Sequence, residues 1–220
     1  MRYGMHRPKT RVVWIALIIS LFFFRGAEAA GVRWVPDGDT LVLVGGETVR
    51  LQGIDAPEVA RDDRPSQYYA VISRAVLQKA VRGKNVTVHK AQAGRDRYGR
   101  LLARVSLKDG TGLSRFMVEQ GAAFAYPHPD QLDADLMREL LVLQRRAIRQ
   151  GAGFWPRVLA VSNQESGWVG NGRSKRFHRL SCRYGKRIGK RNRVSFLSLR
   201  DAFEAGFAPC RKCTPWPVHK

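Results

Sequence analysis

The sequence contains few acidic residues and few cysteines. Only 18 of its 220 residues are Asp or Glu, against 39 Lys or Arg, which gives a formal net charge of +21. Its apolar run at residues 12–24 falls short of the ~20 residues that a membrane-spanning helix needs. These shortages exclude a polytopic membrane protein, and the 44% hydrophobic content excludes a wholly disordered tail. The excess of positive charge predicts an anionic partner, either nucleic acid or an acidic surface.

The first 29 residues have the pattern of a secretory signal peptide. A basic start without acids is followed by the apolar run and then by the small residues Ala27 and Ala29. We expect cleavage after Ala29 and therefore a secreted or periplasmic protein. Because Arg25 interrupts the region before the cleavage position, an uncleaved membrane anchor is the alternative, and only then is a membrane a partner.

Charge and cysteine are unevenly distributed along the rest of the chain. Residues 30–164 contain 20 basic and 14 acidic side chains, whereas residues 165–220 contain 14 basic and 3 acidic ones and all three cysteines. Residues 157–172 have weak periodicity and several Ser, Asn and Gly, as linkers do. The sequence therefore predicts a first domain at residues 30–156, a linker at 157–172 and a basic second domain at 173–220.

The first domain alternates strand patterns with helical ones. Runs rich in Val, Leu and Thr predict strands at residues 32–35, 40–44, 47–53, 85–89 and 101–107. Apolar residues at three- and four-residue spacing predict helices at residues 67–81, 113–120 and 132–150. This order fits an α+β fold built on a five-stranded OB-type β-barrel with helices.

Three short segments of this domain carry carboxylates and arginines: DGDT, RLQGIDAPE and DRYGR. Asp39, Asp55 and a backbone carbonyl offer the oxygen-only ligands that Ca²⁺ prefers, and Glu58 is spaced to act on a nearby water. Arg50 and Arg100 are suited to hold a phosphate from two sides, since a guanidinium pairs bidentately with phosphate oxygens. Phosphodiester hydrolysis needs these parts, although an Asp-Gly pair taken alone more often serves only a turn.

These segments, the order of elements and the closing FWP resemble the thermonuclease, or staphylococcal-nuclease-like, family over about residues 31–156. The resemblance implies an OB-fold barrel that binds one calcium ion and hydrolyses nucleic acid. By this resemblance the calcium ligands are Asp39, Asp55 and the backbone carbonyl of Ala56. Threonine is common in the family at the position of Ala56, but a carbonyl ligand survives that change.

The resemblance also assigns roles around the phosphate. Glu58 takes the place that acts on the attacking water, and Arg50 and Arg100 take the places that bind the scissile phosphate. Aromatic side chains near such a site are able to stack on bases, or alternatively serve only in packing. The candidates for contact with the nucleotide are Arg97, Tyr98 and Tyr126.

Four residues near the C-terminus have the spacing of a zinc site. His178 and Cys182 form one close pair, and Cys210 and Cys213 form a second after a gap of 27 residues. Two close pairs separated by a longer stretch supply four tetrahedral ligands, so we expect a structural Zn²⁺ held by these residues. In an oxidising compartment the alternatives are a disulfide between Cys182 and one of the other two cysteines, or an incomplete cluster.

The segments FHRLSC and GFAPCRKC, both within residues 177–213, resemble the metal-binding domain of Ada-type methylphosphotriester DNA repair proteins. In that family four cysteines hold zinc and the first accepts a methyl group, whereas this chain has His178 at that position. An imidazole does not readily replace a thiolate nucleophile, so methyl-transfer repair is disfavoured. A structural zinc module that binds nucleic acid through the basic residues of 173–193 is preferred, and a merely solvated basic face is the alternative.

Together these features predict a secreted or periplasmic, calcium-dependent nuclease that hydrolyses the phosphodiester bonds of DNA, RNA or both. The substrate is nucleic acid, no stable protein partner is implied, and the C-terminal zinc module adds affinity for the polymer. The alternative is a non-catalytic nucleic-acid binding protein that uses the barrel as a platform. The complete set of acids and arginines argues against that alternative.

Overall fold

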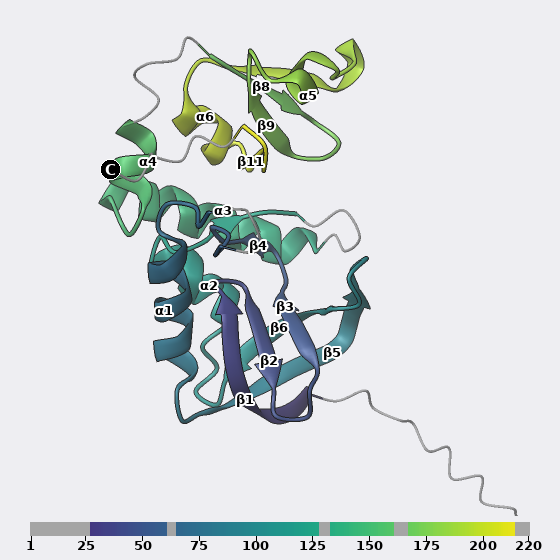
Figure 1. The fold of residues 1–220 in the computed structure, drawn as a ribbon, viewed down its shortest axis with the longest axis vertical. Coiled ribbons are helices and arrows are strands. Elements are labelled where there is room, and N and C mark those ends of the chain that lie inside the picture. Colours follow the sequence, from purple (N-terminus) through teal and green to yellow (C-terminus); the bar gives the residue numbers. More distant parts are fainter. Residues whose placement is uncertain (1–26, 61–64, 128–132, 161–166, 214–220) are drawn as a thin grey trace, which may run out of the picture.

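The first part of the chain forms a closed barrel of five strands. The computed structural model describes residues 27–60, 65–127, 133–160 and 167–213. The barrel strands pair in the order β1-β2-β3-β6-β5, which confirms the predicted five-stranded barrel (Figure 1). Their bounds are β1 Ala27–Asp37, β2 Thr40–Leu43, β3 Thr48–Leu51, β5 Asn85–Arg95 and β6 Leu101–Leu107. Residues 44–47 join β2 to β3 in a turn, where Gly46 has a φ of 86°.

Helices close one end of the barrel. α1 covers Ala70–Val81, α2 covers Leu113–Glu119 and α3 covers Ala134–Gln150. In α3 the buried face includes Leu136, Leu140 and Ala147, and also the polar Gln144, which an apolar pattern does not reveal. The predicted first turn of this helix at residue 132 lies outside the described residues. The helix instead begins at an N-cap, Asp133, whose carboxylate accepts the N–H of Leu136.

The C-terminal part is a second, smaller unit built on a four-stranded sheet of order β10-β8-β9-β11. Its short helices cover the sheet, and α4 leads into it from the end of α3. The bounds are α4 Trp155–Ala160, β8 Trp168–Asn171, β9 Arg176–Arg179, α5 Arg183–Lys186, η2 Lys190–Asn192, β10 Arg193–Phe196, α6 Leu199–Glu204 and β11 Ala208–Pro209. Thus α4 and β8 occupy parts of the range predicted as a linker, and the domain division itself stays a prediction.

An aromatic cluster joins the two units. Phe203 of α6 contacts Trp155 with ring centroids 4.8 Å apart, and it also contacts Phe124 at 5.8 Å and Phe177 at 5.1 Å. Gln144 of α3 strengthens this junction, because its side chain accepts the N–H of Ala125 and donates to the carbonyl of Phe203. In Figure 1, α3 accordingly lies between the barrel and the C-terminal unit. The C-terminal unit therefore shares a second hydrophobic cluster with the helical end of the barrel unit, next to the core inside the barrel itself.

The predicted signal peptide lies mostly outside the described residues, which begin within β1. Ala27 pairs with His89 and Ala29 pairs with Thr87, so residues 27–29 form the first part of this strand. Cleavage after Ala29 would leave the strand with residues 30–37. Among the helices that the structure describes, none combines the length and apolar character required to cross a bilayer.

We expect the Phe203→Ala variant to lose about 3–5 kcal/mol of unfolding free energy, because it empties a fully buried aromatic position. Denaturant unfolding followed by fluorescence and by far-UV circular dichroism should show one shared transition at lower denaturant concentration. The control is Leu197→Ala, at a side chain that is 93% exposed, which should change stability by less than ~0.5 kcal/mol. Two separate transitions in Phe203→Ala, one of them unshifted, would contradict a shared core.

Candidate active site and metal cluster

The turn between β1 and β2 presents two buried aspartates at the mouth of the barrel. The Oδ1 atom of Asp37 accepts the N–H of Asp39 over 3.2 Å, which fixes the turn. A Cβ atom at Gly38 would lie 1.8 Å from Oγ of Ser73, so only glycine lets α1 pack directly on this turn. The Oδ2 atom of Asp39 accepts the N–H of Ala56 over 2.8 Å. The carboxylate is therefore held from both sides.

Arg50 bridges the two predicted calcium ligands. It extends from β3, and its Nη1 and Nη2 atoms lie 2.5 Å from Oδ1 of Asp39 and 2.7 Å from Oδ1 of Asp55. Asp55 belongs to β4 (Ile54–Asp55), which pairs with β7 (Phe124–Ala125) and so fixes the second carboxylate. All three charged side chains are at most 4% exposed. The structure therefore brings Asp39, Asp55 and Arg50 together as the sequence predicts.

The buried cluster holds more negative charge than Arg50 neutralises. Burial raises the pKa of Asp39 to about 7. The positive charge of Arg50 acts to lower this pKa, and the negative charges of Asp37 and Asp55 act to raise it further. Burial also acts to raise the pKa of Asp55, but the guanidinium groups of Arg176, Arg50 and Arg211 together hold that pKa below its usual range. The carboxylate that is most surrounded by arginines is thus the one that stays most firmly ionised.

Two of those arginines come from the C-terminal unit, and the sequence did not reveal their position. Nη2 of Arg176, on β9, lies 2.7 Å from Oδ2 of Asp55. Nη2 of Arg211, just after β11, lies 3.1 Å from Oδ1 of Asp55 and 3.2 Å from Oε1 of Glu58. Arg176 was counted in the predicted basic run, yet its side chain is only 15% exposed and faces the barrel site. No local pattern could have found these contacts, because the Asp55–Arg211 pair joins residues 156 positions apart.

Glu58 and Arg100 lie at the edges of this cluster. The backbone of Glu58 exchanges hydrogen bonds with Gln67, over 2.8 and 2.9 Å, which fixes the loop after β4. Nε of Arg100 donates to Oδ2 of Asp96 over 2.8 Å, and its Nη1 donates to Oγ1 of Thr40 over 3.5 Å. The hydroxyl of Thr40 in turn donates to Oδ1 of Asp39. The side chain of Thr40 therefore connects Arg100 to the carboxylate of Asp39.

The predicted nucleotide contacts lie in two different environments. Arg97 donates from Nη2 to the hydroxyl of Tyr98, whose ring is 64% exposed and lies beside Arg100, with its centroid 5.5 Å from that guanidinium carbon. This ring is available to a base. Tyr126 is instead buried, and the guanidinium of Arg176 lies 3.8 Å from its ring centroid. A stacking role for Tyr126 stays a prediction and requires Arg176 to move.

Beside Arg100 the barrel surface is hollowed. A cavity of about 410 Å³ extends from Thr40 and Arg100 across the outer face of β1 and β2. Its lining includes Trp34, whose side chain is 53% exposed, and Arg74 of α1. The predicted phosphate-binding arginine therefore lies at one end of an open groove that carries an aromatic and a basic side chain.

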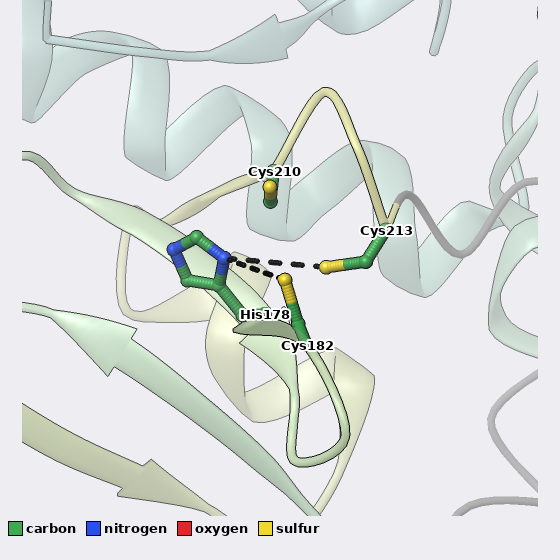
Figure 2. A group of neighbouring side chains, drawn as sticks. All are labelled: His178, Cys182, Cys210 and Cys213. Atoms are coloured by element: carbon green, nitrogen blue, oxygen red, sulfur yellow. Dashed lines mark hydrogen bonds between the residues drawn. The ribbon is translucent and has the colours of Figure 1, made fainter. Parts of the chain in front are cut away.

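The four predicted zinc ligands converge in the C-terminal unit (Figure 2). Their ligand atoms all lie within 4.8 Å of one another. Nδ1 of His178 is 3.6 Å from Sγ of Cys182 and 4.0 Å from Sγ of Cys213. A tetrahedral zinc site with Zn–S bonds of about 2.3 Å separates its ligand atoms by roughly 3.5–3.8 Å. All three cysteines belong to the described residues and are free thiols, so the alternative disulfide is not formed.

Backbone pairing assembles this cluster. β11 runs parallel to β9, and the N–H of Cys210 donates to the carbonyl of Phe177, which places Cys210 next to His178. Sulfur atoms accept backbone hydrogen bonds here, for example Sγ of Cys210 from the N–H of Lys212. The hydrogen bond between Cys213 and Cys210 lowers the pKa of Cys210 to about 3 and raises the pKa of Cys213 above its usual range. Of these two thiols, Cys210 is therefore the one whose thiolate, the form that binds metal, is stabilised.

We expect Arg176→Gln and Asp55→Asn to be energetically coupled. Arg176→Gln should lower the unfolding free energy by about 2–3 kcal/mol, because it leaves a buried carboxylate short of a partner. The double variant should be at least ~1 kcal/mol more stable than the sum of the single effects predicts. Urea unfolding in calcium-free buffer measures this cycle. Strict additivity would show that the ion pair contributes nothing, and the exposed Arg173→Gln is the control for removal of a nearby charge.

Comparison with known proteins identifies the barrel. The family model described as "Staphylococcal nuclease homologue" matches residues 48–157, which is half of the chain. A protein of Escherichia coli named "Uncharacterized endonuclease" is 40% identical over 124 residues, covering 55% of this chain and 72% of its own length. The "Thermonuclease" of Staphylococcus intermedius is 30% identical over 134 residues, covering 59% of this chain and 77% of its own.

A third relative has a different kind of name. The "Succinoglycan biosynthesis protein ExoI" of Rhizobium meliloti strain 1021 is 32% identical over 147 residues, covering 64% of this chain and 73% of its own length. The matched family model ends at residue 157, before the C-terminal sheet, so the resemblance of that unit to Ada-type domains stays a prediction. For the barrel, the family model, the relatives and the acid and arginine cluster agree. The chain belongs to the staphylococcal nuclease homologue family and is a nuclease, an enzyme that hydrolyses phosphodiester bonds.

Proposed function

We propose that this nuclease is calcium-dependent, cleaves DNA, RNA or both, and carries a C-terminal module that is held together by zinc. One observation carries the proposal. Arg50 lies between two buried carboxylates, Asp39 and Asp55, within a cluster whose edges hold Glu58 and Arg100. This is the complete set of groups that the sequence assigned to metal binding, water activation and phosphate binding.

The donor set fits calcium. Asp39 and Asp55 direct carboxylate oxygens at Arg50, and the backbone N–H of Ala56 donates to Asp39. The carbonyl of Ala56 stays a predicted third ligand. Oxygen-only donors suit a hard divalent cation. When bound there, calcium supplies positive charge to the phosphate and so stabilises the charge of the transition state.

The side chains of this protein then divide the remaining work. Glu58, partly exposed beside Asp55, accepts a proton from the attacking water as the water oxygen bonds to phosphorus. One P–O ester bond breaks, and the leaving oxygen takes up a proton from solvent. Arg50 and Arg100 bind the non-bridging oxygens, and they orient the phosphate because the carboxylates of Asp39, Asp55 and Asp96 fix both guanidinium groups.

Two surfaces near the active site are suited to bind the parts of the nucleic acid on either side of the cleaved bond. The groove beside Arg100 offers the exposed ring of Trp34 to unpaired bases, and the exposed ring of Tyr98 lies next to Arg100. The C-terminal module offers a cluster of positive side chains for phosphates, which adds affinity and makes binding salt-dependent. The exposed basic residues of this module include Arg183, Lys186, Arg187, Lys190, Arg191 and Arg193. We further propose that the predicted signal peptide directs the enzyme to a secreted or periplasmic location.

We expect Glu58→Gln to lower kcat by about 10²–10⁴-fold with little change in stability, because the amide keeps the shape of the side chain but accepts no proton. Cleavage of a labelled single-stranded DNA and of a labelled RNA, each in calcium and in excess EGTA, measures this effect. The control is Glu119→Gln, an exposed acid at the end of α2, which should leave kcat unchanged. Full activity of Glu58→Gln, or undiminished wild-type cleavage in EGTA, would contradict the proposed chemistry.

We expect the purified protein to contain about one zinc ion per chain, since four converging ligands form one tetrahedral site. Cys182→Ser should lose the metal and lower Tm by several degrees, because a small unit loses its stabilising metal. Elemental analysis and calorimetry measure both quantities. Ser181→Ala is the matched neighbour and should retain full zinc. A wild-type chain without zinc, and with three thiols titrating freely, would contradict the zinc assignment.

A further inference from the structure

Arg211 lies at the point where the reaction proposed above would take place. Its Nη2 atom contacts Asp55, a proposed metal ligand, and Glu58, the proposed water activator. A phosphate attacked by water under the control of Glu58, and neutralised by a cation on Asp55, must approach both carboxylates. The guanidinium of Arg211 therefore occupies the neighbourhood that the scissile phosphate needs.

Arg176 and Arg211 are held in different ways. The guanidinium of Arg176 lies over the ring of Tyr126, donates to the carbonyl of Pro209 over 2.9 Å and pairs with Asp55, so three contacts fix it. The side chain of Arg211 is 43% exposed, and both of its ion pairs use the same terminal nitrogen. Arg211 is thus the arginine that can exchange one anionic partner for another without breaking the core.

The space between these groups is small. The cavity lined by Asp55, Glu58, Arg176 and Arg211 measures about 10 Å³, which is room for roughly one water. Entry of a phosphate therefore requires Arg211 to leave Glu58. Because a guanidinium pairs bidentately with phosphate oxygens, the incoming phosphate itself supplies the new partner.

Arg50 offers a comparison within the same site. Arg50 also rests on carboxylates, those of Asp39 and Asp55, and it is one of the two arginines assigned to the phosphate. Arg211 shares the partner Asp55 with it and approaches from the opposite unit of the fold. The two guanidinium groups therefore converge on one position from the barrel and from the C-terminal module.

We propose that Arg211 is a third phosphate-binding arginine of the nuclease site, supplied by the C-terminal module from the turn between Cys210 and Cys213. The inference rests on the proposed nuclease chemistry and extends it. Pairing of β11 with β9 and convergence of the two cysteines with His178 place this turn against Asp55 and Glu58. The module consequently takes part in catalysis as well as in binding to the polymer.

The test compares two neighbouring positive side chains in the full chain, purified with its zinc. Arg211→Ala removes the proposed phosphate ligand, whereas Lys212→Ala removes an exposed charge from the same turn. At saturating calcium, we expect kcat/KM for a short single-stranded oligonucleotide to fall about 10–100-fold in Arg211→Ala, the effect of losing one charge-assisted hydrogen bond. Lys212→Ala should stay within about twofold of wild type, and Arg211→Lys should restore part of the activity.

A second readout does not depend on turnover. In a Glu58→Gln background, fluorescence anisotropy measures the affinity of the same labelled oligonucleotide in calcium. Here Arg211→Ala should raise Kd about tenfold and Lys212→Ala should not. Zinc content and Tm of both variants are measured alongside, and unchanged values exclude misfolding as the cause.

The outcomes separate the two proposals. If the wild-type chain does not cleave in calcium, the proposed function fails. If it cleaves and Arg211→Ala behaves like Lys212→Ala in both assays, the function stands and the role of Arg211 is wrong. Faster cleavage by Arg211→Ala, with a lower calcium requirement, would likewise overturn the inference and identify Arg211 as an inhibitory occupant of the metal site.

Discussion

The pairing of Arg50 with Asp39 and Asp55 is the interaction on which the site depends. Each carboxylate comes from a different element, the turn after β1 and the short strand β4, and neither would remain buried and ionised beside the other without a cation between them. The barrel supplies one such cation, Arg50, against the charges of Asp37, Asp39 and Asp55. The C-terminal unit adds two more, because Arg176 and Arg211 both pair with Asp55.

The aromatic cluster gives this electrostatic arrangement its rigidity. Phe124 pairs in β7 with Asp55 and packs against Phe203 of α6, so the backbone next to the active carboxylate is part of the shared core. On the other side, Phe177 of β9 lies between Arg176 and His178 in sequence and faces the same core. The active site and the metal cluster therefore both adjoin this apolar junction, and Arg211 in the turn between Cys210 and Cys213 contacts the active site directly.

The barrel, the active-site residues and the metal cluster could be predicted from the sequence, whereas the packing between the two units could not. The strands and helices of the barrel domain could be predicted because each element has a periodic pattern within its own short segment. The turn DGDT and the segment RLQGIDAPE identified the site because their residues act over short separations, and paired Cys and His spacing identified the metal cluster for the same reason. The contacts between the C-terminal unit and the barrel join residues far apart in the sequence, so no local pattern predicts them. Arg176 looked like one more surface charge, and the polar Gln144 on the buried face of α3 broke the apolar pattern, although both mark that interface.

The long separation between Asp55 and Arg211 has a consequence for the order of events during synthesis. The last barrel strand is complete at residue 107, about a hundred residues before Arg211 joins the chain. A barrel that forms in this interval contains Asp37, Asp39 and Asp55 with only Arg50 to neutralise them. During this interval Asp55 therefore lacks two of the three arginines that hold its pKa low, and it gains them only when β9 and the turn after β11 dock against the barrel.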